Sequence, residues 1–129
     1  MVKVYLSGGM ASGWQDEIKQ KLQKDVLFFD PRTHNFHSPK SYTAWDLLAV
    51  DQCDIVFAYM EDINPSGIGL ALEVGYAKAK GKFVILVDEK ASPYFPIVAE
   101  CANVVCYNLK LGLTVLVKVL GLFQERKND

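Results

Sequence analysis

The chain of 129 residues has the length of one domain, and half of its residues are hydrophobic while 22% are charged. Its net charge of −1 excludes a general attraction to nucleic acid polymers or anionic membranes. No apolar run approaches the roughly 20 residues that cross a bilayer, and Gly8 and Gly9 interrupt the N-terminal apolar stretch too early for a signal peptide. We therefore expect one cytoplasmic domain over residues 1–129.

The cysteines also favour a cytoplasmic protein. Cys53, Cys101 and Cys106 are an odd number of thiols without a CxxC pair. We expect them to be reduced and mostly buried, in preference to a disulfide between Cys101 and Cys106.

The first predicted elements are a strand, a glycine-rich loop and a helix. A β-rich run at Val2–Leu6 precedes the loop Ser7–Gly13 and an amphipathic helix over Trp14–Lys24, which Ser12 is expected to cap. This arrangement binds phosphates or sugars in parallel α/β folds, because N–H groups at the helix start point into the crevice. The loop matches neither the dinucleotide fingerprint nor the P-loop.

Strands and helices continue to alternate down the chain. In order, we predict a strand at Asp25–Phe29, a polar loop at Asp30–Pro39, a helix capped by Ser38 up to about Val50, a strand at Ile55–Met60, a helix from Ile68 to about Lys80 capped by Ser66, a strand at Lys82–Val87, a short helical segment up to Cys101, a strand at Asn103–Tyr107, a helix at Leu109–Phe123 and a fraying tail at Gln124–Asp129.

Five strands alternating with helices predict an α/β fold with three αβα layers around a five-stranded parallel sheet, flavodoxin-like or Rossmann-like. Ligands in such sheets bind beyond the carboxyl ends of the strands, where the strand order switches. The Gly8-Gly9 loop, the loop after Phe29 and the turn at Pro65-Ser66-Gly67 all fall on that edge.

Two carboxylates stand alone on predicted helices. The residues one helical turn from Glu73 are apolar or small, and those around Asp46 include no Lys or Arg. An uncompensated carboxylate among apolar residues is costly and is often functional, although Glu73 at a helix edge facing water is the structural alternative. A pair of carboxylates suits glycosidic bond cleavage, because one acts on the anomeric carbon and the other handles a proton. Tyr5 is placed to hydrogen-bond the nucleophile, or is an ordinary strand aromatic.

These residues also carry a resemblance to a known family. The evidence is the segment Val4-Tyr5-Leu6-Ser7-Gly8-Gly9, Asp46 eight residues before Asp54, and Pro65-Ser66-Gly67 leading into Leu72-Glu73-Val74-Gly75-Tyr76-Ala77. In this order and spacing the chain resembles the nucleoside 2-deoxyribosyltransferase family, which includes 2′-deoxynucleoside 5′-monophosphate N-glycosidases. The resemblance spans residues 2 to about 88.

The resemblance implies a role for each matching residue. Glu73 falls on the nucleophile, Asp46 on the proton donor and Tyr5 on the tyrosine that contacts the nucleophile. Asp54 matches a second aspartate that lines or supports the site. The remaining matches are Ser7, Gly8, Gly9 and Met10 in the loop over base and sugar, and Ser66 and Gly67 in the turn near the 5′ end.

The implied activity is N-glycosidic bond cleavage of a (deoxy)nucleoside and transfer of the deoxyribosyl group to another base through a glycosyl-glutamate intermediate. Hydrolysis of a (deoxy)nucleoside 5′-monophosphate is the alternative. The nucleotide-cleaving members carry a phosphate-holding arginine in the first loop that this loop lacks, although Arg32 is a substitute from the next loop. The transferases have an acidic residue six positions before the nucleophile, where this chain has Gly67. Homodimers or higher homo-oligomers are implied.

Three other interpretations compete with this one. Asp30, His34 and His37 are a conceivable but weakly patterned metal site. A non-catalytic nucleotide-binding domain keeps the fold but leaves Glu73 and Asp46 unexplained. Cys53 is disfavoured as a nucleophile, because no His is nearby and it leads into a buried strand. The favoured chemistry requires no organic cofactor or metal.

Overall fold

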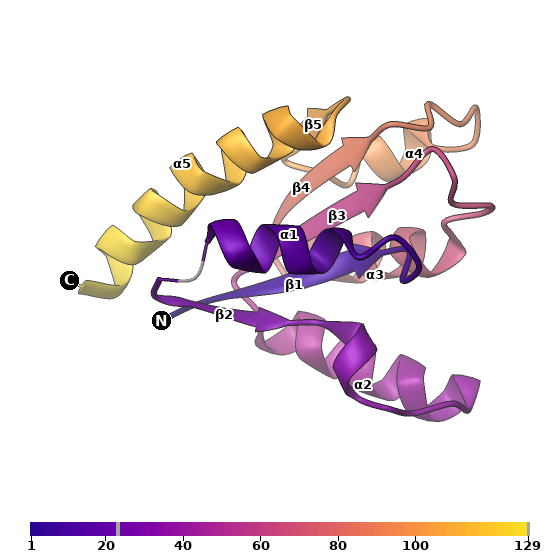
Figure 1. Ribbon diagram of the computed structural model, residues 1–129, viewed down its shortest axis with the longest axis horizontal. Helices are drawn as coiled ribbons and strands as arrows, with labels where there is room; N and C mark the ends of the chain where they lie inside the picture. The colour runs from indigo at the N-terminus through magenta and orange to yellow at the C-terminus, as the bar shows by residue number, and fades with distance from the viewer. Residues whose placement is uncertain (23, 129) are drawn as a thin grey trace.

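In the computed structural model, which describes residues 1–22 and 24–128, five parallel strands form one sheet in the order β2-β1-β3-β4-β5 (Figure 1). This is the flavodoxin-like order, and its switch point lies between β1 and β3. The predicted fold class is confirmed. The elements are β1 (Val2–Gly8), α1 (Trp14–Lys21), β2 (Val26–Phe29), the 3-10 turn η1 (Pro31–Thr33), α2 (Pro39–Gln52), β3 (Ile55–Met60), α3 (Ile68–Ala79), β4 (Phe83–Asp88), α4 (Pro96–Ala99), β5 (Val104–Cys106) and α5 (Leu109–Asn128).

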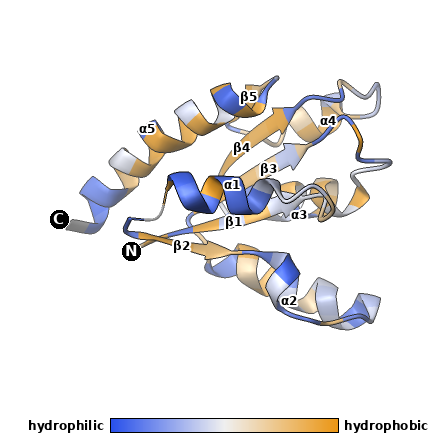
Figure 2. Ribbon diagram, in the orientation of Figure 1, coloured by the Kyte–Doolittle hydropathy of each residue, from blue (hydrophilic) through white to orange (hydrophobic). Residues whose placement is uncertain are grey.

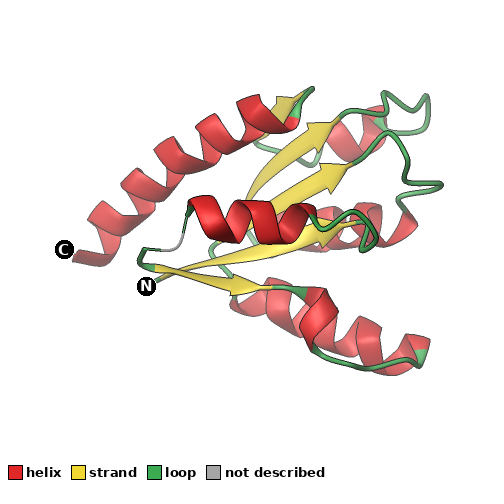
Figure 3. Cartoon of the chain, in the orientation of Figure 1, coloured by secondary structure: helices red, strands yellow, loops and turns green. Residues whose placement is uncertain are grey.

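Helices cover both faces of the sheet. Figure 3 shows helical layers on either side of the strands, with α1 and α5 on one face and α2, α3 and α4 on the other. Every residue of β3 is buried, and the apolar strands stand out against the hydrophilic α1 and the C-terminal end of α5 in Figure 2. The sequence of a strand that is buried on both faces is a continuous apolar run, because neither side of the strand contacts water.

Alternation along β1 and β3 divides the core into two clusters. Leu6 and Phe57 pack under α1 and α5, whereas Tyr5, Ala58 and Met60 pack under α2 and α3. Fully burying one large apolar side chain contributes about 1.5–3 kcal/mol. Each cluster contains many such side chains, so burial in both clusters holds the helices on the sheet. The strands all point away from the end of the molecule where the two termini lie (Figure 1).

Two predicted helix caps are wrong. Gly13 and Gly67, both with positive φ, occupy the N-cap positions of α1 and α3 where we predicted Ser12 and Ser66. The Ser12 hydroxyl instead donates to Glu61 Oε1 at 2.7 Å, so it is used between elements rather than at the helix start. The predicted Ser38 cap of α2 is confirmed, because its Oγ accepts from the N–H of Ser41.

The last helix is longer than predicted. Residues 124–128 continue α5 where we expected a fraying tail. Two contacts hold them: Arg126 Cζ lies 5.3 Å from the centroid of the Phe123 ring, and Lys127 Nζ lies 3.2 Å from Asp54 Oδ2. The first helix is shorter and ends at Lys21, three residues before the predicted end. Gln23 and Asp129, which fall within these two predictions, lie outside the described residues.

The three cysteines are free, as predicted. Cys53 and Cys106 are buried, and burial raises the pKa of the Cys53 thiol to about 12. Among the described helices, none combines the length and the apolar character that crossing a membrane requires.

Candidate active site

The carboxyl end of β1, beside the switch point, meets the middle of α3. Tyr5 and Ser7 are two residues apart on β1 and therefore point to the same face, toward α2 and α3. Ser7 is fully buried, and its hydroxyl donates to Glu73 Oε1 at 2.7 Å. This hydrogen bond fixes one oxygen of the Glu73 carboxylate against the sheet.

Glu73 is a buried acid on the inner side of α3, only 8% exposed. The pKa of its carboxyl group is raised from 4.5 to about 7: burial is the largest cause, the Ser7 hydrogen bond opposes it, and the nearby charge of Asp46 adds to it. The structural alternative of a glutamate facing water is therefore wrong. The second isolated carboxylate is in fact a neighbour of the first.

Asp46 faces the same site from α2 and is also 8% exposed. Burial raises the pKa of its carboxyl group, opposed by His34. Two buried carboxyl groups whose charges act on each other favour a state in which one is protonated and the other ionised. Such a pair of carboxyl groups supplies one group that can donate a proton and one that can act as a base or nucleophile.

Tyr5 completes the buried polar group from the sheet side. Its side chain is fully buried, and burial together with the charges of Glu73 and Asp46 raises the pKa of its hydroxyl. The hydroxyl makes no hydrogen bond of good geometry to any residue that the structure describes. Tyr5 thus lies close enough for both carboxylates to raise the pKa of its hydroxyl, and this hydroxyl is buried beside Glu73.

His34 is a residue of this site that the sequence did not reveal. It follows η1 in the loop after β2, and its Nε2 lies 3.5 Å from Asp46 Oδ1. The metal grouping considered as a weak alternative for His34 does not form: Asp30 pairs with Lys19 and Arg32, and His37 is exposed. No cluster of three possible metal ligands occurs within residues 1–22 and 24–128. The signal that could have found His34 is its position in the loop after β2, at the edge of the sheet where ligands bind.

The glycine-rich loop is held in a defined shape. Gly8 ends β1 at φ 150°, and a Cβ there would run into the Tyr59 carbonyl oxygen. The Gly9 carbonyl accepts from Trp14 Nε1 at 2.8 Å and from Gln15 Nε2 at 2.9 Å. Met10, the next residue, is 53% exposed at the loop surface. The predicted loop residues therefore stand at the end of β1, directly after Ser7.

The turn before α3 is equally constrained. Gly67 has φ 68°, and a Cβ would lie 2.7 Å from Met60 Sδ and 2.8 Å from Phe95, so a larger residue would strain the backbone and displace these side chains. Asn64 Oδ1 accepts from the N–H of Gly67 at 3.2 Å, and Ser66 is exposed at the tip. Lys90 Nζ donates to the Asn64 carbonyl oxygen. The turn enters α3 six residues before Glu73.

Two residues considered from sequence are not brought to this cluster. Asp54 precedes β3, so it lies at the amino edge of the sheet, where its carboxylate accepts from the N–H of Lys3 at 2.9 Å. Arg32 is occupied by an acidic pair, because its guanidinium donates to Asp30 at 2.6 Å and to Asp16 at 2.7 Å. It is committed to protein partners rather than to a phosphate.

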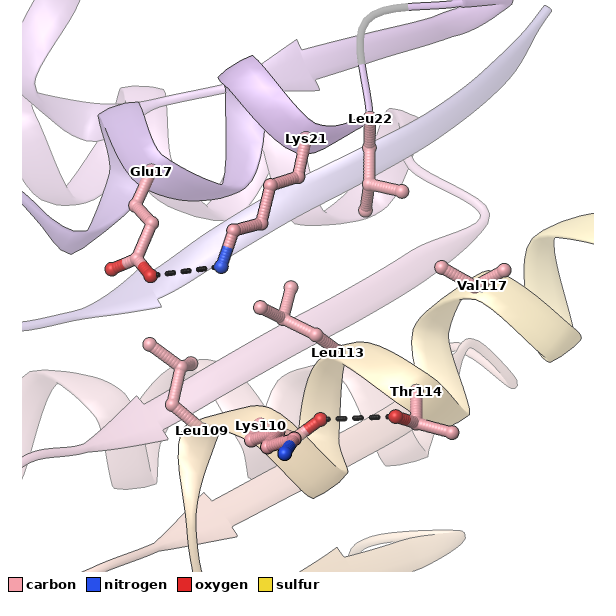
Figure 4. A pocket seen from close by; sticks show the side chains of 8 residues that line it. All are labelled: Glu17, Lys21, Leu22, Leu109, Lys110, Leu113, Thr114 and Val117. Atoms are coloured by element: carbon pink, nitrogen blue, oxygen red, sulfur yellow. Dashed lines mark hydrogen bonds and ion pairs between the residues drawn. The ribbon is translucent and has the colours of Figure 1, made fainter.

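A groove of about 450 Å³ lies on the other face of the sheet, between α1 and α5. Figure 4 shows Leu22 and Leu113 along its sides, with the Lys21–Glu17 ion pair on the α1 rim. None of the buried carboxylates lines it. The groove and the buried polar groups therefore lie on opposite faces of the sheet. We place the candidate active site at the buried polar groups, because perturbed titratable groups cluster at functional sites.

A family model described as "Nucleoside 2-deoxyribosyltransferase like" matches residues 1–91, which contain the whole of the buried cluster. The chain belongs to this family. No curated protein matches the sequence.

Solved structures share the fold at low sequence identity. A 2-desoxiribosyltransferase from Leishmania mexicana is 14% identical with a TM-score of 0.69, covering 92% of this chain and 98% of that one. A 2-deoxyribosyltransferase from Bacillus psychrosaccharolyticus is 19% identical with a TM-score of 0.66, covering 83% and 87%. The CMP N-glycosidase BcmB of Clostridium botulinum is 23% identical with a TM-score of 0.60, covering 88% and 97%.

Proposed function

We propose that this protein cleaves the N-glycosidic bond of a (deoxy)nucleoside and transfers the deoxyribosyl group to another base. The observation that carries the proposal is the buried pair of Glu73 and Asp46, two acids from different helices whose pKa values are both raised. The transition state of glycosidic cleavage is oxocarbenium-like, so a carboxylate beside the anomeric carbon compensates its charge.

The first half-reaction assigns one role to each acid. The Glu73 carboxylate, held by Ser7, attacks C1′ while the bond from C1′ to the base nitrogen breaks and its electron pair stays on the base. In the reactive form of the pair the shared proton is on Asp46 and Glu73 is ionised, and Asp46 gives this proton to the departing base. Tyr5 has a free hydroxyl beside Glu73 and positions the nucleophile or the sugar.

The second half-reaction reverses these steps. A nitrogen of the acceptor base attacks C1′, the bond from C1′ to the Glu73 oxygen breaks, and the proton of the acceptor returns to Asp46. Water in place of the base gives hydrolysis. The loop Ser7, Gly8, Gly9 and Met10 is proposed to cover base and sugar, and Ser66 with Gly67 to lie near the 5′ end.

The glycine-rich loop favours a nucleoside over a monophosphate. It contains no arginine, and Arg32 from the neighbouring loop is paired with Asp30 and Asp16. The second candidate is a hydrolase acting on a (deoxy)nucleoside 5′-monophosphate. It is favoured by Gly67, because this position holds glycine where transferases hold an acid.

An exposed apolar stripe supports the proposal that the protein is a homodimer or a higher homo-oligomer. Ile68 is 75% exposed and Leu72 is 54% exposed on α3, and Leu48 is 60% exposed on the adjoining α2. A second copy of the chain that covers this stripe removes apolar surface from water. The three free thiols fit a cytoplasmic protein.

Incubation with deoxynucleosides and deoxynucleoside monophosphates, each with and without a free acceptor base, tests the function. Transfer predicts a new nucleoside only when the acceptor is present. Hydrolysis predicts free sugar or sugar phosphate without it. Absence of turnover with every substrate, together with unchanged ligand binding by Glu73→Ala, would support a non-catalytic binding domain instead.

A further inference from the structure

His34 and Asp46 form a buried contact in which neither facing atom has another partner. His34 Nε2 and Asp46 Oδ1 lie 3.5 Å apart, and both atoms lack a hydrogen-bond partner among the described residues. The two side chains are only 8% and 11% exposed, so water has little access to them. Buried polar atoms without partners are rare and call for an explanation.

The second nitrogen of the ring determines what the first one can do. His34 Nδ1 accepts a hydrogen bond from the backbone N–H of Phe36 at 2.9 Å. The nitrogen that accepts carries no proton, so this hydrogen bond assigns the ring hydrogen to Nε2, on the side of Asp46. Protonating Nδ1 as well would set two donors against each other. His34 thus presents its Nε2–H to Asp46.

Aromatic neighbours hold the ring in this orientation. The imidazole stacks on Phe36 with centroids 5.4 Å apart and meets Trp45 edge-on at 5.0 Å. Trp45 directly precedes Asp46 on α2, so the same helix turn places both the ring and its acceptor. The loop after β2 therefore delivers an N–H to one oxygen of Asp46.

We propose that His34 is a positioning residue that acts through Asp46, donating an Nε2–H hydrogen bond to the negative charge that appears on Asp46 Oδ1 when this acid gives its proton to the departing base. The role rests on the function proposed above. No proton leaves His34: the proton of Asp46 moves to the base nitrogen and the carboxylate remains. At 3.5 Å the contact is open in the resting site and shortens as charge develops, since catalytic hydrogen bonds often tighten only along the reaction.

Two substitutions at His34 test the N–H donor and the packing of the ring independently. His34→Phe keeps the stacking on Phe36 and Trp45 and removes the N–H, whereas His34→Gln keeps an N–H at the position of Nε2 and removes the ring. We expect kcat/KM to fall about 10- to 100-fold in the Phe variant, the size of a lost hydrogen bond to a charged group, and to be largely retained in the Gln variant. His37→Phe, at the exposed histidine of the same loop, is the matched control and is expected to change nothing.

A double-mutant cycle tests whether the effect passes through Asp46. The Asp46→Asn variant has no charge at this position to stabilise. In this background we expect His34→Phe to lower kcat/KM by less than twofold. Activity of the Phe variant equal to that of the parent, equal losses in the Phe and Gln variants, or additive losses with Asp46→Asn would each overturn the proposal.

Histidine ¹⁵N NMR separates failure of this proposal from failure of the proposed function. If the parent turns over no substrate, the function fails, yet the spectrum still tests the contact. We expect one histidine with an accepting Nδ1 and a protonated Nε2, whose Nε2 signal moves in Asp46→Asn. The opposite tautomer, or an Nε2 signal that Asp46→Asn leaves in place, would overturn the role of His34.

Discussion

The two faces of the sheet treat charged side chains in opposite ways. On the face of α1 and α5, a groove of about 450 Å³ opens between apolar walls, and its acid Glu17 pairs with Lys21 in water at 3.0 Å. On the face of α2 and α3, Glu73 and Asp46 are buried, and among the described residues His34 is the one basic side chain within ion-pair distance of either carboxylate. The groove thus lies beside an ordinary solvent-exposed ion pair, whereas the buried acids lie on the opposite face.

Energetics explain why this difference identifies the site. Raising the pKa of Glu73 from 4.5 to about 7 corresponds to roughly 3 kcal/mol against its ionised form in the folded state. A domain of this size has a net stability of about 5–15 kcal/mol, so the cost is a substantial part of it. A fold retains such a group where function requires it, and the sharpest tests therefore compare substitutions on the two faces.

The largest effect is expected from Glu73→Gln, which keeps the shape of the side chain and removes the nucleophilic oxygen. We expect kcat/KM to fall by about 10⁴-fold or more, in the range seen when a covalent nucleophile is lost. Steady-state kinetics with the best deoxynucleoside measure it. Thr114→Val, in the groove of the opposite face, is the control and should stay within twofold of the parent. Similar losses in both variants would remove the distinction between the faces.

Asp46→Asn should have the next largest effect, a loss of about 10²- to 10⁴-fold in kcat, because the amide has no proton for the departing base. Single-turnover measurement of base release follows this step. Asp51→Asn on the same helix removes only a partner of Lys80 at 3.6 Å and is expected to be neutral. An Asp46→Asn enzyme with the rate of the parent would refute the assignment of the acid.

Stability should depend on pH through Glu73. Because its pKa is higher in the folded state than in the unfolded chain, ionising it costs folding free energy as the pH rises from 4.5 through about 7. Glu73→Gln should therefore be about 3 kcal/mol more stable than the parent at pH 8 and no more stable at pH 4. Urea unfolding at the two pH values checks this. An equal difference at both would show that the carboxyl group does not titrate as described.

Ser7→Ala should give the smallest of these effects. Losing the 2.7 Å hydrogen bond removes a contact that favours the ionised Glu73, so the pKa of this carboxyl group rises further. We expect an approximately tenfold lower kcat/KM at pH 7 and an acid limb displaced to higher pH. Ser41→Ala, at the exposed start of α2, is the matched control. A lower rate with an unmoved pH profile would argue against a bond to the ionised nucleophile.

The sequence predicted what depends on pattern. Continuous apolar runs such as Ile55–Met60 identify the buried strands, and the absence of a basic neighbour marks Glu73 and Asp46 as unusual. Parallel topology then brought the loop after β1 and the start of α3 to one edge of the sheet, as expected.

Contacts between distant segments were beyond reach of the sequence. Ser7 is expected from the sequence only as part of the loop over base and sugar, and the hydrogen bond of its hydroxyl to Glu73, 66 residues away, has no signal in the sequence. His34 was grouped by spacing with Asp30 and His37, whereas side-chain packing turns it to Asp46. Asp54 was aligned with the site although its position before β3 places it at the opposite edge. The contacts of Ser7 and His34 depend on three-dimensional packing that local pattern does not encode, whereas the place of Asp54 follows from the predicted strand that it precedes.

The central claim is that Glu73 becomes bonded to the sugar. Intact-protein and peptide mass spectrometry of an acid-quenched reaction with a deoxynucleoside, without acceptor base, measures this directly. We predict a mass increase of one deoxyribosyl group, located on the peptide that contains Glu73 and absent from Glu73→Gln. Base release by the parent without any adduct, or an adduct that persists in Glu73→Gln, would contradict the account.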